Sequence, residues 1–438
     1  MGKTKKENFK KYYTKTRRRK HKRAAHRDAR VTKIIDVTPI ERSILGDRVS
    51  AEMRISPEMN STLIMGQSDS ATYSPRINEK LVKRRSSAQR TKIELCDEES
   101  WLTDYKKPLK IQIGNKCVEY NDKKAVHLFL KNLQANKHIN PSKVIAPKQS
   151  DQNCWFNTIF VAYFISDKGR KFFHFFRQCI IEGKTAVDDD IPESLKNAFA
   201  VLNYAIESCI FGSEFAYHYD SNYIIGNIYE NLPHYLKTRH LVVDVGVHGN
   251  GFIYFNHMFE YIFGTYGITE LALIYHLHMD LQSYRGTETE EDGSILVDKA
   301  IKRYIMEYEI PEIFVVSCNM ELHQEERNKI VKQKHIRIGD VNTIYNDVHV
   351  HDDIEYTLDS CILRDNEGHH FAAFITCENE EYCFDGMSFR SLSPFAWKDK
   401  VNKNEDFVFV KDEDYKHYSD LTFNFRVGYQ MLFYYRTK

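Results

Sequence analysis

The sequence of 438 residues lacks several patterns that would assign it quickly. It has no Cys-x-x-Cys pair, which argues against a zinc ribbon or finger, and no run of about 18 uncharged apolar residues, which argues against a transmembrane helix. It also lacks a glycine-rich phosphate loop and a Gly-x-Ser-x-Gly turn, so nucleotide hydrolysis and serine hydrolase chemistry have no support. The amino terminus is charged where a signal peptide needs an apolar segment, and we therefore expect an intracellular protein, cytoplasmic or nuclear.

Cysteine is scattered along the chain. The nine cysteines are odd in number and lack the close spacing of a small disulfide scaffold: Cys96, Cys117, Cys154, Cys179, Cys209, Cys318, Cys361, Cys377 and Cys383. This distribution predicts reduced thiols. What the chain has in quantity is apolar surface, with 42% hydrophobic residues and 27 each of Tyr and Phe. That composition is sufficient for a large core.

Charge is divided unevenly along the chain. Residues 1–95 contain 25 Lys and Arg against 10 Asp and Glu, a net charge of +15, and since the whole chain carries +1, residues 96–438 carry −14. Most of the positive excess lies in residues 1–33, where apolar residues are too sparse for a core, so we predict a disordered basic arm. Such an arm could bind nucleic acid or a nuclear import receptor. The alternative is a solvated tail that only aids solubility.

Residues 34–95 have the composition of a flexible linker, with few aromatics and with Pro57 and Pro75. The folded domain is predicted over residues 96–438. Near its start, "LKIQIGNKCVEY" predicts a strand pair around Gly114, and "KKAVHLFLKNLQAN" has the apolar spacing of a helix.

The rest of the chain divides into a region with helical sequence patterns and a region with strand patterns. Between about residues 155 and 280, long apolar segments without proline predict helices. After about residue 310, short runs rich in β-branched and aromatic residues predict strands: "EIFVVSC", "YTLDSCILRD", "HFAAFITC", "EYCFDGM", "DFVFV" and "YQMLFYY". Helices followed by an antiparallel sheet form an α+β fold, in which a cleft between the two layers is a natural place for a site.

The segment "APKQSDQNCWFNTIFVAYF" carries the first candidate for chemistry. Polar residues lead from Pro147 to Cys154, where a long apolar helical pattern begins, so Cys154 is predicted at a helix N-terminus. The helix dipole and the free N–H groups there stabilise a thiolate, which is the reactive form of cysteine. A buried structural cysteine is the alternative for a Cys considered alone.

A nucleophilic thiol needs a base within hydrogen-bond reach and a third group that orients the base. The segment "DNEGHHFAAFITCENEEYCFDGMS" offers both, because His369 and His370 precede one predicted strand and Asp385 follows the next. A hairpin of these strands would set the Asp beside the His. Side chains alternate along a strand, so only one of the two histidines is expected to face the thiol.

These segments resemble three sequence boxes of the ubiquitin-specific proteases, a family of papain-like deubiquitinases, and the boxes occur in the same order. The family's Cys box, roughly Asn-x-Gly-Asn-Thr-Cys-Tyr-x-Asn-Ser-x-Leu-Gln, is similar to the segment that begins at Gln149. Its His box, Gly-His-Tyr-x-x-Tyr followed by aromatic-x-Phe-Asp-Asp, is similar to "GHHFAAF" and "YCFDGM", and its last strand, Ala-Tyr-x-Leu-Phe-Tyr-x-Arg, to "GYQMLFYYR". The resemblance covers residues 149–436 and implies a papain-like fold, with a helical subdomain followed by an antiparallel sheet subdomain.

The resemblance also implies roles for single residues. Cys154 would be the nucleophile, and Asp385 would orient the base. His370 is followed by Phe-Ala-Ala-Phe, as in the family's box, and is the preferred base, whereas His369 keeps the glycine adjacent and is the alternative. Gln149 occupies the position of the family's Asn and would bind the oxyanion through its amide, with Gln152 as the competing candidate.

Two departures from the family pattern accompany these matches. Asp151, Gln152 and Asn153 stand where the family has Gly-Asn-Thr, and Gly386 stands in place of the second Asp of its Asp-Asp pair. The lack of Cys-x-x-Cys pairs further implies that the zinc-bound fingers subdomain of many family members is absent or held together without metal.

The function that the resemblance implies is a thiol-dependent deubiquitinase. It would hydrolyse bonds to the C-terminal glycine of ubiquitin or a ubiquitin-like modifier through an acyl-enzyme, with no cofactor and no metal. The alternatives are a papain-like protease that processes other precursor proteins, an inactive relative that binds ubiquitin, and a nucleic-acid protein with a basic arm. The histidine pairs in "YHLHMDL" and "VHVHDD" are interpreted as packing or surface residues, because no third ligand follows at a fixed spacing.

Overall fold

A computed structural model describes a large part of the chain after residue 89. The described residues are 90–98, 107–135, 137–235, 249–270, 274–279, 294–307, 310–320, 330–339, 341–342, 349–350, 353–365, 370–410 and 421–438. All of them belong to one compact unit. The predicted basic arm and most of the predicted linker lie outside these residues.

A small hairpin lies at the start of the described chain. β1 (Lys110–Ile113) and β2 (Lys116–Glu119) pair as antiparallel strands, and Gly114 takes a left-handed φ of 59° in the turn between them. The strand pair predicted around Gly114 is therefore confirmed. The preceding residues pair with β1 in turn, because Cys96 N–H donates to Lys110 O and Gln112 N–H donates to Glu94 O.

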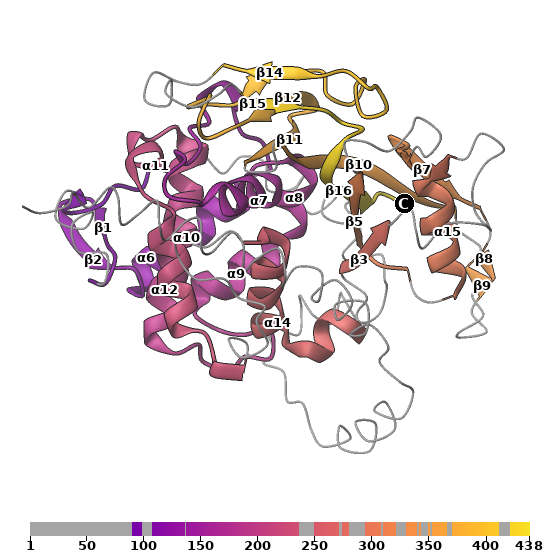
Figure 1. The fold of residues 1–438 in the computed structure, drawn as a ribbon. Helices are drawn as coiled ribbons and strands as arrows, with labels where there is room; N and C mark the ends of the chain where they lie inside the picture. Colours follow the sequence, from indigo (N-terminus) through magenta and orange to yellow (C-terminus); the bar gives the residue numbers. More distant parts are fainter. Residues whose placement is uncertain are drawn as a thin grey trace, which may run out of the picture. The chain divides into compact units, whose positions relative to one another are not determined.

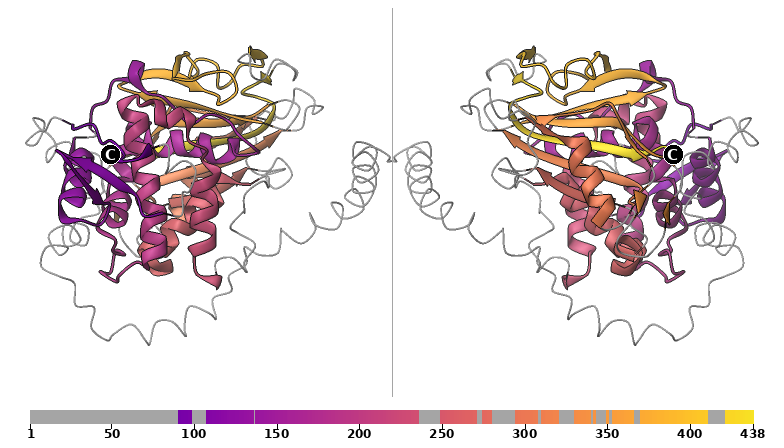
Figure 2. Two further views of the ribbon diagram at one scale, coloured as in Figure 1. Left: turned by 90° about the vertical axis from the view of Figure 1, so that its left-hand side faces the viewer. Right: turned by 90° about the vertical axis from the view of Figure 1, so that its right-hand side faces the viewer.

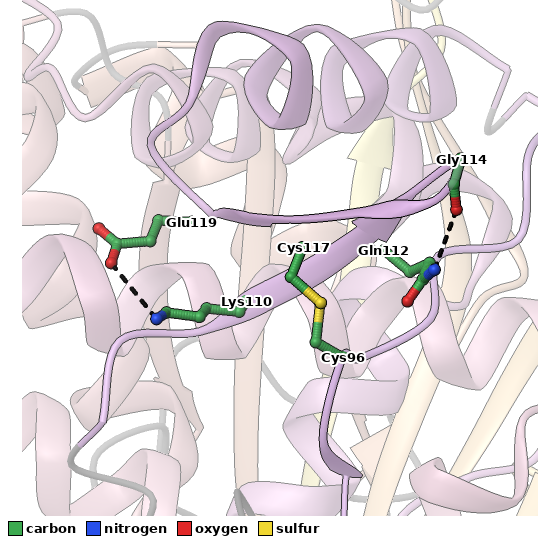
Figure 3. The surroundings of a disulfide bond; sticks show 6 residues. All are labelled: Cys96, Lys110, Gln112, Gly114, Cys117 and Glu119. Atoms are coloured by element: carbon green, nitrogen blue, oxygen red, sulfur yellow. Dashed lines mark hydrogen bonds and ion pairs between the residues drawn. A yellow bond between two sulfur atoms is a disulfide. The ribbon is translucent and has the colours of Figure 1, made fainter.

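A disulfide joins Cys96 to Cys117 of β2, with the two Cα atoms 5.8 Å apart (Figure 3). The prediction of reduced thiols is wrong for this pair. The two cysteines are 21 residues apart, and they meet because the chain before β1 folds back onto the hairpin, a contact that their spacing could not reveal. The other seven cysteines are free and buried.

Residues 90–95, which the sequence analysis assigned to the end of the linker, contact the helical part of the domain. Arg90 Nη2 binds Glu207 Oε2 at 2.7 Å, and Glu207 is almost completely buried. Thr91 exchanges two hydrogen bonds with the buried amide of Asn132. Ile93 is buried in the same core.

The helical layer follows the hairpin. Its helices are α6 (Lys123–Gln134), α7 (Cys154–Phe164), α8 (Asp167–Phe172), α9 (His174–Glu182), α10 (Glu193–Phe211), α11 (Glu214–His218), α12 (Asn222–Asn231) and α14 (Gly251–Glu270), with a short 3-10 helix at Pro141–Lys143. All 11 residues of α7 are buried, as expected for a helix that is apolar all round. No helix among the described residues is long and apolar enough to cross a membrane.

The second layer is a sheet. Its strands are β3 (Ile274–Met279), β5 (Ile313–Met320), β7 (His335–Ile338), β10 (Ile354–Arg364), β11 (Phe371–Cys377), β12 (Glu380–Phe384), β13 (Ser393–Pro394) and β16 (Gly428–Arg436). Within the described residues the order is β13-β12-β11-β10-β16-β5-β3, with β7 paired to one end of β10. The strands predicted after residue 310 are confirmed. Helices before a mainly antiparallel sheet make the fold mixed α and β.

One strand corrects the predicted division of the chain. β3 falls within the stretch predicted to be helical, and it pairs with β5 in parallel, so the sheet is not wholly antiparallel. Its side chains alternate between the two faces of the sheet, with His276 and His278 on one face and Leu277 and Met279 on the other. This period of two is typical of a strand. It was not recognised in the sequence because β3 follows long apolar helices and was assigned to the same helical stretch.

Both faces of the sheet are buried. The helical layer covers one face, and α15 (Val297–Glu307), Trp397 and the strand pair β14 (Phe407–Phe409) and β15 (Leu421–Phe423) cover the other (Figures 1 and 2). Two further pairs of short strands complete the described elements: β4 (Ile295–Leu296) with β6 (Ile330–Val331), and β8 (Val341–Asn342) with β9 (His349–Val350).

Candidate active site

Three elements meet where the candidate residues lie. Cys154 is the first residue of α7, His370 directly precedes β11, and Asp385 directly follows β12. β11 and β12 are antiparallel with Ala373 opposite Phe384, so β11 begins where β12 ends. α7 packs against β11 (Figure 1). The structure therefore brings together the residues that were predicted to be nucleophile, base and acid.

The imidazole of His370 connects the other two side chains. Its Nε2 hydrogen-bonds Asp385 Oδ1, and the Cys154 thiol lies close enough to the same ring to raise its pKa. Because Asp385 occupies Nε2, Nδ1 is the ring nitrogen left for the thiol. Asp385 is fully buried, and Cys154 and His370 are each 4% exposed, so water screens these contacts little.

Burial and polar partners act in opposite directions on the pKa of His370. Burial lowers the pKa because the imidazolium loses its hydration, but the charge and hydrogen bond of Asp385, together with Cys154, outweigh burial and raise the pKa to about 10. The imidazole is therefore charged at neutral pH. A neighbouring imidazolium favours the thiolate form of a cysteine, and the thiolate is the nucleophile.

The backbone of His370 is held by Asp365, which follows β10. Asp365 Oδ1 accepts the His370 N–H at 2.6 Å, and the Asp365 N–H donates to His370 O at 2.9 Å. Both residues are buried. Residues 366–369 lie outside the described residues, so His369 as the alternative base stays a prediction.

Gln149, the predicted oxyanion residue, lies beside the acid. Its backbone N–H donates to Gly386 O at 3.0 Å, and a Cβ on Gly386 would come within 2.8 Å of Gln149 N. Glycine therefore permits this close approach where the family pattern has a second Asp. Gln152, the competing candidate, has a φ of 54°, in the left-handed region that is unfavourable for a side chain with a Cβ.

A buried polar network holds the residue before Cys154. Asn153 is the N-cap residue of α7, but its side chain makes no bond to the helix backbone. Its Nδ2 instead donates to Ser221 Oγ at 2.8 Å and to Asp220 Oδ1 at 3.3 Å, and its Oδ1 accepts the Ser150 N–H at 3.0 Å. Ser221 Oγ in turn donates to Asn157 Oδ1 at 2.6 Å. Asn153, Asn157 and Ser221 are almost completely buried.

Asp365, and residues 220–222 that enter this network, were not predicted from the sequence. Asp-Ser-Asn before the apolar run of α12 is a helix-start pattern, so the position of the turn was visible in the sequence. No local pattern indicated that the turn contacts Asn153. Asp365 had no sequence signal beyond its place at the end of a predicted strand.

No group of three or more His, Cys, Asp or Glu is arranged for metal binding among the described residues. In "YHLHMDL", His276 lies on β3 and hydrogen-bonds Ser317 Oγ at 2.6 Å. Burial, with the neighbouring His278, lowers the pKa of His276 to about 3, so the ring is neutral. In "VHVHDD", residues 348, 351 and 352 lie outside the described residues, and residues 349–350 form β9.

No protein-family model and no curated protein matches the chain. Among solved structures, the chain is similar to one of the SAGA DUB module bound to monoubiquitin, with a TM-score of 0.40, 11% identity, and coverage of 68% of this chain and 70% of that chain. A structure of the SAGA Ubp8/Sgf11/Sus1/Sgf73 DUB module bound to ubiquitin aldehyde gives a TM-score of 0.37, 10% identity, and coverage of 68% and 70%. These values are low, so the function is inferred below from the residues of the site.

Proposed function

We propose that the chain is a thiol hydrolase in which Cys154 is the nucleophile, His370 the base and Asp385 the residue that orients the base. The observation that carries this proposal is the hydrogen bond from the His370 imidazole to Asp385 Oδ1, with the Cys154 thiol beside the same imidazole at the N-terminus of a buried helix. A nucleophile, a base and an orienting group in hydrogen-bond contact are the arrangement that activates a thiol.

The other free cysteines differ from Cys154 in their surroundings. Burial raises the pKa of each of their thiols, which keeps them protonated at neutral pH: Cys179, Cys209, Cys318, Cys361, Cys377 and Cys383. Thiols in this state are poor nucleophiles. Cys154 is therefore the cysteine to which we assign the chemistry.

The reaction proceeds in two halves. The Cys154 thiolate attacks the substrate carbonyl and forms the C–S bond of a tetrahedral oxyanion, and His370 then gives its proton to the amine as the C–N bond breaks. Water, deprotonated by His370, next attacks the thioester, releases the carboxylate and restores the thiol. At the start of α7 the N–H groups of Phe156 and Asn157 donate to Asn153 O, so the N–H of Cys154 and the Gln149 amide are the proposed donors to the oxyanion.

We propose ubiquitin or a ubiquitin-like modifier as the source of the carbonyl, with a papain-like arrangement of the two layers. The support is the resemblance of three boxes to the ubiquitin-specific proteases. The boxes fall on α7, on the β11–β12 hairpin and on β16, the strand between β10 and β5. In this proposal residues 96–438 form the catalytic domain.

A ubiquitin probe with an electrophile at its C-terminus tests both parts of the proposal. We expect a covalent adduct with the wild-type chain under reducing conditions and none with Cys154→Ser. Cys383→Ser is the matched control, because Cys383 is also buried and lies on β12 next to the site. An adduct that forms equally in Cys154→Ser would show that Cys154 is not the nucleophile.

A second outcome separates the substrate from the chemistry. Iodoacetamide modification of Cys154 that is fast in the wild type and slow in His370→Ala, without any ubiquitin adduct, would reject ubiquitin and retain the thiol hydrolase. The alternative of a protease for other precursors would then be tested with peptide libraries.

A further inference from the structure

We propose that residues 220–222, the turn at the start of α12, position the oxyanion site. The inference rests on the proposed thiol chemistry but not on ubiquitin as its substrate. The turn contacts Ser150, Asp151 and Asn153 of residues 148–153, the loop that contains Gln149 and precedes Cys154.

The first set of contacts holds the middle of the loop. Asp220 Oδ1 accepts a hydrogen bond from Ser150 Oγ and another from Asn153 Nδ2, the latter at 3.3 Å. Asn222 Nδ2 donates to Ser150 Oγ and to Asp151 O, both at 3.1 Å. The turn thus binds the side chains of Ser150 and Asn153 and the backbone of Asp151.

The second set of contacts ties the loop to α7. Ser221 Oγ lies between Asn153 Nδ2 and Asn157 Oδ1, at 2.8 Å and 2.6 Å. Asn157 Nδ2 then reaches back to Lys148 O at 3.3 Å. Removal of this one hydroxyl would take from Asn157 Oδ1 its bond to the turn and would leave Asn153 Nδ2 with Asp220 and Ser150 as acceptors, so the link between the loop and α7 would be weakened.

The loop needs this support because its backbone is unfavourable on its own. Gln152 has a left-handed φ of 54°, and such a conformation persists only where the surroundings hold it. On its other side the loop is held by the bond from Gln149 N–H to Gly386 O. Gln149 and the N–H of Cys154 therefore lie between two anchors, Gly386 and the α12 turn.

The contacts assign the turn to the oxyanion site and not to the thiol and its base. Among the described residues, the hydrogen bonds of Asp220, Ser221 and Asn222 reach the loop and α7, and none reaches His370 or Asp385. Donors to an oxyanion act only when they are placed accurately, and a misplacement of about 1 Å can cost 100-fold in rate. The three residues of the turn are therefore positioning residues.

Two reactions of Cys154 separate these roles. Acylation by p-nitrophenyl acetate forms a C–S bond through a tetrahedral oxyanion and releases p-nitrophenolate, whereas alkylation by iodoacetamide displaces iodide and forms no oxyanion. The ratio of the two rate constants, each corrected for the Cys154→Ser background, reports the oxyanion site independently of thiolate formation. Neither reagent requires knowledge of the natural substrate.

Four variants are compared with the wild type. In Ser221→Ala and Asp220→Ala we expect the ratio of acylation to alkylation to fall at least about tenfold. Asp220→Asn keeps the accepting oxygen and should retain the wild-type ratio. Ser166→Ala is the matched control, because it removes a fully buried hydroxyl of the same helical layer, bonded to Ala162 O at 2.7 Å, and it should also keep the ratio.

The inference is overturned if the ratio is unchanged in both Ser221→Ala and Asp220→Ala, including the case in which both reactions slow equally. It is also overturned if the wild type shows no Cys154-dependent acylation. If Ser221→Ala does not fold, the ratio in Asp220→Ala is compared with that in Asp220→Asn, since Asp220 is only half-buried. The ratio of acylation to alkylation could fall in these variants although the wild type forms no ubiquitin adduct. That result would support the positioning role of the turn and reject ubiquitin as the substrate.

Discussion

The two sides of the candidate site are built differently. His370 and Asp385 lie at adjoining ends of β11 and β12, and the backbone ladder of this hairpin sets their separation. Cys154 follows a loop that is held by hydrogen bonds among Asn, Ser and Asp side chains. A ladder tolerates exchange of side chains, whereas a buried side-chain network fails when one member is removed. The nucleophile side is therefore the more sensitive to substitution outside the reacting residues.

The hairpin side matches the boxes of the ubiquitin-specific proteases closely, whereas the loop before Cys154 departs from them. The His box fits the hairpin, whose backbone carries the geometry. The departures before Cys154 include Asp151 and Asn153, and both are bound by the α12 turn. Changed side chains in the loop are thus accompanied by partners on another helix.

The largest expected effect lies on the hairpin side, at the base. His370→Ala should lower kcat for a fluorogenic ubiquitin substrate about 1,000-fold, since no group would then take the thiol proton or protonate the leaving amine. His369→Ala is the matched control and should retain turnover. The reverse result would transfer the base to His369 and would break the assignment of the hairpin side.

The next effect concerns the acid. Asp385→Asn should lower kcat about 100-fold, because the charge that stabilises the imidazolium is lost. Asp385 raises the pKa of His370, so its loss lowers that pKa and the imidazolium deprotonates at lower pH. The alkaline limb of the profile of kcat/KM against pH should therefore move to lower pH. An alkaline limb that stays in place would show that Asp385 does not act on His370.

A smaller effect is expected where the two sides touch. In Gly386→Ala the new Cβ would lie 2.8 Å from Gln149 N, so the loop must shift away from the acid. We expect kcat to fall about tenfold, with iodoacetamide alkylation of Cys154 unchanged. Gly339→Ala is the control, because a Cβ there meets nothing within 4 Å. Equal turnover in both variants would show that the loop does not depend on this contact.

The smallest effect on turnover is expected at the disulfide. β1 and β2 contact α6, and Figure 1 shows them on the side of the helical layer away from the eight-stranded sheet. Cys96→Ser opens a loop of 21 residues and should lower the free energy of unfolding by about 3 kcal/mol, with kcat unchanged. Thermal unfolding with and without reductant measures the change, and Cys96→Ser should not respond to reductant. A fall in kcat would connect this hairpin to the site.

Local patterns in the sequence were sufficient for much of the fold and for selecting three residues, the proposed nucleophile, base and acid, that lie close together in the structure. Alternation and composition located β10, β11, β12 and β16, and the start of an apolar run located Cys154 at a helix N-terminus. Contacts between distant segments could not be read in this way. Asn153 and Ser221 are 68 residues apart, and their hydrogen bond depends on how α10 and α12 pack. The disulfide was missed for the same reason, whereas β3 was missed because its local alternation follows directly on long apolar helices.

Arg90 has a practical consequence for anyone who prepares a shortened protein for crystallisation. The predicted domain boundary at residue 96 suggests a start that removes this residue. Among the described residues, buried Glu207 would then keep only the ion pair with Arg177, and the amide of Asn132 would lose both hydrogen bonds to Thr91. Ile93 would leave a gap in the core beside them. A start several residues ahead of Arg90 keeps all these contacts, and the yield of soluble protein from the two lengths would compare them directly.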